Sequence, residues 1–160
     1  MSIFPAKILL ASDGSEEAEL ARTTAVDMAT TTGSELHVVT VASGHAPYDG
    51  YLSHDVRIPE VAEQLRKRAE IILDEQVQKI EWDGGKVAQK HLKIAELIAE
   101  RHTAQQILRV AEDIEAGLIV MGSRGRGGVQ RALMGSVSDS VVRQAHCPVL
   151  VVRYERERAA

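Results

Sequence analysis

Five short, mainly apolar runs separated by segments of helical spacing constrain the fold of this chain most strongly. Four of the runs are Ile8–Ala11, Leu36–Val41, Leu118–Met121 and Val149–Val152, and Lys86–Leu92 is a weaker fifth candidate. Strands that are apolar on both sides are typical of a parallel sheet covered on both faces. Their alternation with helices predicts a doubly wound α/β domain, a five-stranded parallel sheet with helices on both faces.

The helical segments carry their own boundary signals. Ser15 followed by two glutamates predicts a helix N-cap, and Gly33 predicts the end of that helix. Further helices are expected from Pro59 to about Asp83, from Thr103 to Glu115 with Gly117 as the stop, and over Ser136–Ala145. Residues 43–58 are expected to form a long loop. The pattern of residues 86–102, before the helix that starts at Thr103, fits either a strand or a helix.

Composition excludes several classes of partner. The formal net charge is −4 and aromatic residues make up 3% of the chain, so we expect neither nucleic acid nor a membrane surface as partner. Cys147 is the single cysteine, which excludes an intrachain disulfide. We find no signal-peptide pattern and no apolar run of the roughly 20 residues that a membrane span needs. We therefore expect one cytoplasmic domain over residues 1–160.

A glycine-rich segment after the fourth strand carries most of the functional signal. Gly122 and Gly125 directly follow that strand, and Gly135 and Ser136 open the next helix. Glycines let backbone amides approach a phosphate, and a helix start adds N–H donors and a positive dipole end. The pattern predicts a phosphate cradle, although Gly122 and Gly125 alone also fit a simple tight turn.

The chain resembles the universal stress protein family over nearly its whole length. The residues that carry the resemblance are Ile8–Ser15, Leu118–Gly125, and Gly135-Ser136 followed by His146–Val152. In that family the pattern G-x2-G-x9-G-[ST] marks the ATP-binding branch, and Gly122, Gly125, Gly135 and Ser136 complete it here. The resemblance implies strand order 3-2-1-4-5 and a homodimer that pairs the last strand, about 148–153. It also implies an ATP-binding stress sensor or switch in the cytoplasm, with magnesium accompanying the ATP.

The resemblance also implies roles for single residues. Asp13 would contact the ribose or adenine and is the candidate for magnesium, and the backbone of Val41 would meet adenine. The remaining nucleotide-binding candidates are Ser12, Met121, Gly122, Arg124, Gly125, Gly135, Ser136, Val137 and Ser138, of which the glycines, Arg124, Ser136 and Ser138 would line the phosphates. Valine at Gly122 or Gly135 would then occupy phosphate space and abolish binding while leaving the fold intact.

Each of these residues has a purely structural alternative. Asp13 fits a local turn, and Ser136 fits a helix N-cap paired with Asp139 in a capping box. The alternatives for the whole protein are a nucleotide-free dimerising module and a slow ATPase or adenylyl-transfer enzyme on the same fold.

Catalytic and metal-binding chemistry have weak support in the sequence. The glycine segment lacks the lysine of a Walker A loop, so we expect no catalytic residue and at most slow hydrolysis. Of six histidines none forms an HxH or HxxxH pair, which argues against zinc. His45 and His54 fall in the long loop and are expected to be solvated.

Overall fold

A computed structural model describes residues 4–43, 59–95, 100–124 and 134–154. The elements are β1 (Lys7–Ala11), α1 (Glu16–Thr32), β2 (Glu35–Ala42), α2 (Pro59–Trp82), β3 (Val87–Ile94), α3 (Glu100–Asp113), β4 (Leu118–Gly122), α4 (Ser136–Gln144) and β5 (Val149–Val152). The five strands form one parallel sheet in the order β3-β2-β1-β4-β5. The expected fold class and strand order are therefore confirmed.

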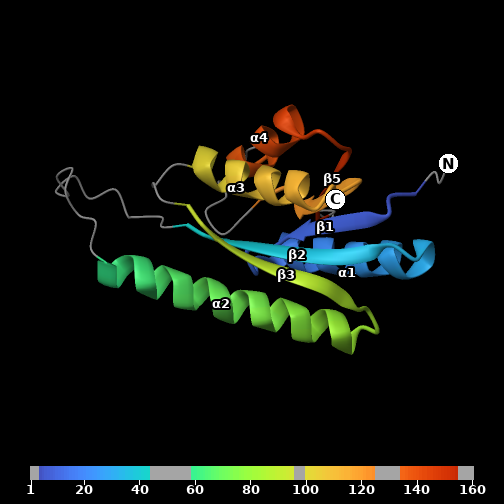
Figure 1. The fold of residues 1–160 in the computed structure, drawn as a ribbon, viewed down its shortest axis with the longest axis horizontal. Coiled ribbons are helices and arrows are strands. Elements are labelled where there is room, and N and C mark those ends of the chain that lie inside the picture. Colours follow the sequence, from blue (N-terminus) through green and yellow to red (C-terminus); the bar gives the residue numbers. More distant parts are fainter. Residues whose placement is uncertain (1–3, 44–58, 96–99, 125–133, 155–160) are drawn as a thin grey trace, which may run out of the picture.

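The sheet lies between two helical layers (Figure 1). One apolar cluster joins alternate residues of β1, β2 and β4 to α3 and α4, and a second joins the intervening residues to α1 and α2. Ile8, Leu9 and Leu10 are all completely buried, because β1 is central and covered on both faces. This double burial is the physical reason for the continuous apolar runs in the sequence.

Helix α1 is bounded by the two residues that the sequence predicts. The Ser15 side chain accepts a hydrogen bond from the amide of Ala18, and Gly33 takes the left-handed conformation with φ 70°. The buried face consists of small residues, mainly alanines at 18, 21, 25 and 29, which lets the helix lie close to β1 and β4. The N-terminus of α1 is thus held close to the sheet by both capping and packing.

Two helix boundaries differ from the expectation. Helix α3 ends at Asp113, and the left-handed residue beyond it is Glu115 with φ 55°, so Gly117 does not end the helix. A Cβ at Gly117 would lie 2.7 Å from Cβ of Pro5, so this glycine allows a close chain approach. Helix α4 has Gly135 as its N-cap and Ser136 as its first residue, so Ser136 is not the cap.

The segment that the sequence left open between strand and helix is resolved as strand β3. It pairs with β2 at the edge of the sheet, with one register shift between Leu36 and His37. Residues 44–58, most of the expected long loop, and residues 96–99 lie outside the described part of the chain.

A polar network joins α1 to α2 beside the second apolar cluster. The Glu19 carboxylate accepts hydrogen bonds from Gln76 Nε2 at 2.7 Å, Lys79 Nζ at 2.9 Å and Arg22, and Arg22 also pairs with Asp83. Burial alone would raise the pKa of Glu19, but these hydrogen bonds together lower it below its ordinary value.

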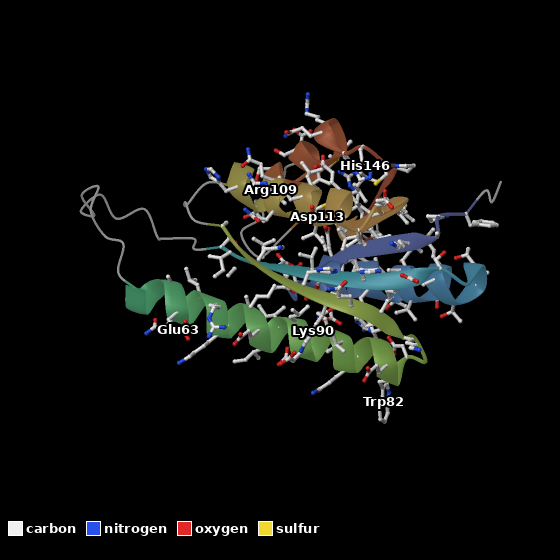
Figure 2. The ribbon with its side chains drawn as sticks, viewed as in Figure 1. Glu63, Trp82, Lys90, Arg109, Asp113 and His146 are labelled. Carbon is white, nitrogen blue, oxygen red and sulfur yellow. The ribbon has the colours of Figure 1, made fainter. Side chains whose placement is uncertain are left out.

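Helix α2 ends in an exposed aromatic residue. Trp82, the one tryptophan of the sequence, is 91% exposed and projects away from the sheet (Figure 2). Within the described residues, no helix combines the length and the apolar character that crossing a membrane requires.

Candidate functional site

The candidate site lies where the chain switches direction across the sheet. From β1 the chain builds outward to β2 and β3, and then returns to add β4 and β5 on the other side. The carboxyl ends of β1 and β4 are adjacent, with Ala11 paired to Met121. In open α/β sheets, ligands bind in the crevice outside such strand ends, so the topology alone places a site here.

The exit of β1 forms a tight turn into α1. The amide of Ser15 donates to Asp13 Oδ1 at 3.0 Å, and the amide of Gly14 donates to Ser12 Oγ at 3.3 Å. Gly14 has φ 74°, a conformation that favours glycine. Ser12 is buried and Asp13 is half-buried, and the turn hydrogen bonds bear out the structural alternative for Asp13 without testing a ligand contact.

The exit of β4 is held by the first turn of α1. Glu17 Oε2 accepts hydrogen bonds from Ser123 Oγ at 2.5 Å and from the Arg124 amide at 2.7 Å. Ser15 Oγ lies 3.4 Å from the Arg124 carbonyl oxygen. Met121 is buried in the α3–α4 cluster, so its side chain belongs to the core.

The N-terminus of α4 meets the same segment. The Gly135 amide donates to the Ser123 carbonyl oxygen at 2.6 Å, and Ser138 Oγ lies 2.8 Å from that oxygen and 3.0 Å from the Gly135 carbonyl oxygen. Ser138 is buried, so its hydroxyl links α4 to β4. Ser136 is exposed, and Val137 packs its side chain on the core.

Gly122 and Gly135 are needed for close packing within the protein. A Cβ at Gly122 would lie 2.9 Å from both C and Cβ of Glu17 and 3.1 Å from the Ala18 amide nitrogen. A Cβ at Gly135 would lie 2.9 Å from the Ser123 carbonyl oxygen. The expectation that valine at these positions would intrude on phosphate space needs this correction, because the first contacts are with the protein's own backbone.

The remaining predicted residues lie near the end of β2 or outside the described part of the chain. Val41 is half-buried near the end of β2 and packs against the α3–α4 cluster. Gly125 lies in 125–133, outside the described residues, and His45 and His54 lie in 44–58, also outside them. The structure thus brings the turn after β1 to the β4 exit and ties the β4 exit to α4, and it does not place Gly125.

Sequence reasoning missed Glu17 and Ser123 as members of this site. Glu17 was interpreted only as a favourable charge in the first turn of a helix, and the structure adds its two bonds to the β4 exit. These partners lie more than a hundred residues apart in the sequence, so spacing gives no signal for the contact.

Two histidines approach each other away from this site. His37 Nδ1 and His91 Nε2 lie 3.3 Å apart on β2 and β3, and their rings stack with centroids 5.6 Å apart. Burial, with smaller effects of His37 and Lys93, lowers the pKa of His91. No group of three or more potential metal ligands occurs among the described residues.

The cysteine–histidine neighbours near the start of β5 are not arranged as a nucleophile and base. His146 Nε2 lies 3.1 Å from the Ala116 carbonyl oxygen, and Cys147 packs on the α3–α4 cluster. Burial raises the pKa of the Cys147 thiol, which disfavours the reactive thiolate.

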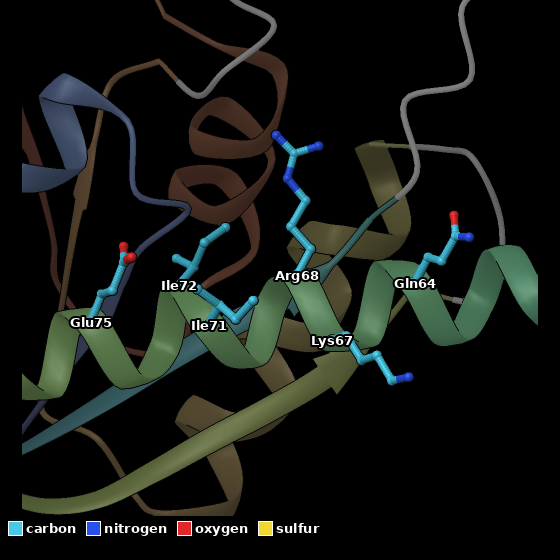
Figure 3. A pocket seen from close by; sticks show the side chains of 6 residues that line it. All are labelled: Gln64, Lys67, Arg68, Ile71, Ile72 and Glu75. Carbon is cyan, nitrogen blue, oxygen red and sulfur yellow. The ribbon is translucent and has the colours of Figure 1, made fainter.

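A shallow hollow on α2 is not continuous with the site. It has a volume of about 460 Å³ and is lined by residues of that one helix (Figure 3): Gln64, Lys67, Arg68, Ile71, Ile72 and Glu75. Helix α2 covers the sheet face opposite to α3 and α4, whereas the start of α4 lies in the other layer.

The fold and the site define a doubly wound α/β domain with its candidate site at the switch point between β1 and β4. The model of the universal stress protein family matches residues 6–153, and the chain belongs to this family.

Individual relatives agree over nearly the full chain. A universal stress protein of Methanocaldococcus jannaschii is 33% identical over 147 residues, covering 92% of this chain and 81% of the relative. The solved structure of the universal stress protein UspA from Lactobacillus plantarum superposes with a TM-score of 0.72 at 26% identity, covering 95% of this chain and all of the other. A universal stress protein from Archaeoglobus fulgidus in complex with dAMP has a TM-score of 0.63 at 23% identity, covering 94% and 99%. At that identity the last comparison shows the fold.

Proposed function

We propose that this chain binds an adenine nucleotide, ATP with Mg²⁺, at the carboxyl ends of β1 and β4. The observation that carries the proposal is the start of α4, which has Gly135 as its N-cap and no side-chain cap bond. The first amides of a helix have no acceptor within the helix, so those of Ser136, Val137 and Ser138 can donate to phosphate oxygens. The dAMP in the Archaeoglobus fulgidus relative is consistent with an adenine nucleotide here.

The other candidate residues would each contact a different part of the nucleotide. Arg124 and Gly125 would complete the phosphate contacts, because arginine suits phosphate geometry and glycine allows close approach. Asp13, at the exit of β1, offers a carboxylate for Mg²⁺ or the ribose, and Val41 offers backbone to the adenine. Magnesium would neutralise phosphate charge in this arrangement, and the protein would supply the amide donors and the position.

The proposed role is that of a cytoplasmic stress switch. Nucleotide at the start of α4 would shift the equilibrium of the β4 exit, which is tied to α1 through Ser123 and Arg124, and so change a surface that partners read. No catalytic residue is assigned, and hydrolysis would be slow.

A homodimer through residues 148–153 is part of the proposal. Pro148 and Val152 use their carbonyl oxygens to pair with β4, which in a parallel ladder directs the amide of Val151 to the outer edge of β5. Val151→Pro would remove that outer donor and keep the β4 pairing. We expect sedimentation velocity to find a dimer for the wild type and a monomer for the variant, and a dimeric variant would refute this interface.

Nucleotide binding is tested on freshly purified protein. Mass spectrometry of small molecules released by denaturation is expected to find an adenine nucleotide. The melting temperature is expected to rise with added ATP and Mg²⁺, with about 2.7 kcal/mol of stabilisation at a hundred-fold excess over Kd. Ser136→Ala should reduce this rise, whereas Ser140→Ala, one turn further along α4, should not.

A nucleotide-free dimerising module is the second candidate. It is favoured by the packing of Gly122 and Gly135, since close contacts inside the protein explain both glycines without a ligand. Absence of released nucleotide together with an unchanged melting temperature at millimolar ATP would support this candidate and refute nucleotide binding.

A further inference from the structure

Glu17 places a negative charge on donors of the kind that hold phosphate. Its Oε2 atom accepts hydrogen bonds from the Ser123 hydroxyl at 2.5 Å and the Arg124 amide at 2.7 Å. Backbone amides in the turn that follows a strand bind anions in α/β proteins, for example in the P-loop. Here one carboxylate oxygen of the protein itself occupies both donors.

The position of this carboxylate is fixed by packing. Glu17 is half-buried, and its Cβ lies so near Gly122 that a side chain there would collide with it. Ser123, whose hydroxyl donates to this carboxylate, also accepts a hydrogen bond from the Gly135 amide at 2.6 Å through its carbonyl oxygen. Ser123 therefore links Glu17 directly to Gly135 at the start of α4, where the phosphates would lie.

We infer that Glu17 sets the charge preference of the site, acting as a built-in anion that disfavours nucleotides in proportion to their phosphate charge. The inference rests on the proposed adenine-nucleotide function and adds to it a specificity-determining residue. Two effects are combined in this side chain. Its hydrogen bonds position the β4 exit, which helps every ligand, and its charge repels phosphate, which penalises ATP more than AMP and adenosine not at all.

Glutamine at position 17 separates the two effects. Its Oε1 atom has two lone pairs and can accept both the Ser123 and the Arg124 bonds, so positioning is kept and only the charge is lost. Glu17→Ala removes both. Glu16→Gln is the matched control, since it makes the same charge change one residue earlier on the exposed side of the same helical turn.

The experiment is isothermal titration of the wild type and the three variants with adenosine, AMP and ATP, in EDTA so that ATP carries its full charge. In Glu17→Gln we expect adenosine affinity to stay unchanged, AMP affinity to rise, and ATP affinity to rise most, by about ten-fold, as for a partly screened repulsion between unit charges. The gain should shrink as salt is raised from 50 to 500 mM, because screening weakens the repulsion. Glu17→Ala should weaken all three ligands relative to Glu17→Gln.

Two results would overturn the inference alone. One is an ATP-to-adenosine affinity ratio in Glu17→Gln equal to that of Glu16→Gln, and the other is an equal loss for all three ligands, which would leave positioning as the whole effect. A wild-type protein that binds none of the three ligands in EDTA, and no ATP when Mg²⁺ replaces the EDTA, would instead refute the proposed function, and the inference with it.

Discussion

Helices α1 and α4 begin after adjacent parallel strands, at the carboxyl end of the sheet, and their N-termini are capped in different ways. Helix α1 has the Ser15 side-chain cap and three acids in its first turn, Glu16, Glu17 and Glu19. Helix α4 has Gly135 as its cap with no side-chain bond, and its one first-turn acid, Asp139, pairs with Arg143 at 2.9 Å. The first helix satisfies one of its own amide donors with a side-chain cap, whereas the N-cap residue of the second has no side chain to do so.

This difference in capping indicates different roles for the N-termini of α1 and α4. The acidic start of α1 is favourable for the helix dipole and anchors the β4 exit through Glu17, so it acts as a support. The start of α4 rests on that support through Ser123, and its amides are the candidates for phosphate. Substitutions in α1 should therefore lower stability first, and substitutions at the surface of α4 should lower binding first.

The largest effect is expected from Gly122→Val, which breaks the support itself. The new side chain would collide with the backbone and Cβ of Glu17, and overpacking of this kind costs about 1–3 kcal/mol. Urea denaturation should show a lower midpoint with an unchanged m-value. Gly33→Ala is the control for backbone strain without a collision, because nothing lies within 4 Å of a Cβ there and the left-handed conformation costs an L-residue about 1–2 kcal/mol. A Gly122→Val midpoint equal to that of the wild type would show that α1 can shift freely, contrary to the support role.

The pair Ser15→Ala and Ser136→Ala separates the two helix starts. Loss of the Ser15 cap should cost about 1 kcal/mol of unfolding free energy. Ser136 is exposed and caps nothing, so its replacement should change stability by less than about 0.5 kcal/mol while weakening nucleotide binding. Thermal melts and ATP titrations of both variants check this, and equal destabilisation by the two would contradict the contrast.

The smallest effect concerns the pH dependence given by Glu19. Because folding lowers the pKa of Glu19, its contribution to stability is present above the ordinary carboxyl value of 4.5 and is lost as pH falls through the lower folded-state pKa. The stability difference between wild type and Glu19→Gln should thus be greatest near neutral pH and vanish in acid. Since the carboxylate is half-buried and solvent still screens its ion pairs, this difference should stay below about 1 kcal/mol. Urea midpoints measured from pH 6 to pH 3 test it, and a difference that grows on acidification would reverse the assigned sign.

Local signals account for most of the fold. Val149–Val152 matches its strand to the residue, and Ser15 and Gly33 bound α1, because apolar runs and caps act over a few residues. The prediction that Gly117 ends α3 failed, because this glycine instead allows two distant segments of the chain to pack closely, at Pro5. The bond from Ser123 to Glu17 and the stacking of His37 on His91 arise only when separate strands and helices come together. The nucleotide site itself stays a prediction, and nothing in the sequence indicated the contacts that Glu17 and Ser123 make around Gly122 and Gly135.

The exposure of Trp82 determines how this protein can be observed. Its indole is already in water in the native state, and it is the only one in the chain. Intrinsic tryptophan emission should therefore change little on unfolding, and the melts above need circular dichroism instead. Trp82 is nevertheless useful as a binding reporter. A blue shift of its fluorescence emission on addition of another protein would signal contact at the C-terminal end of α2.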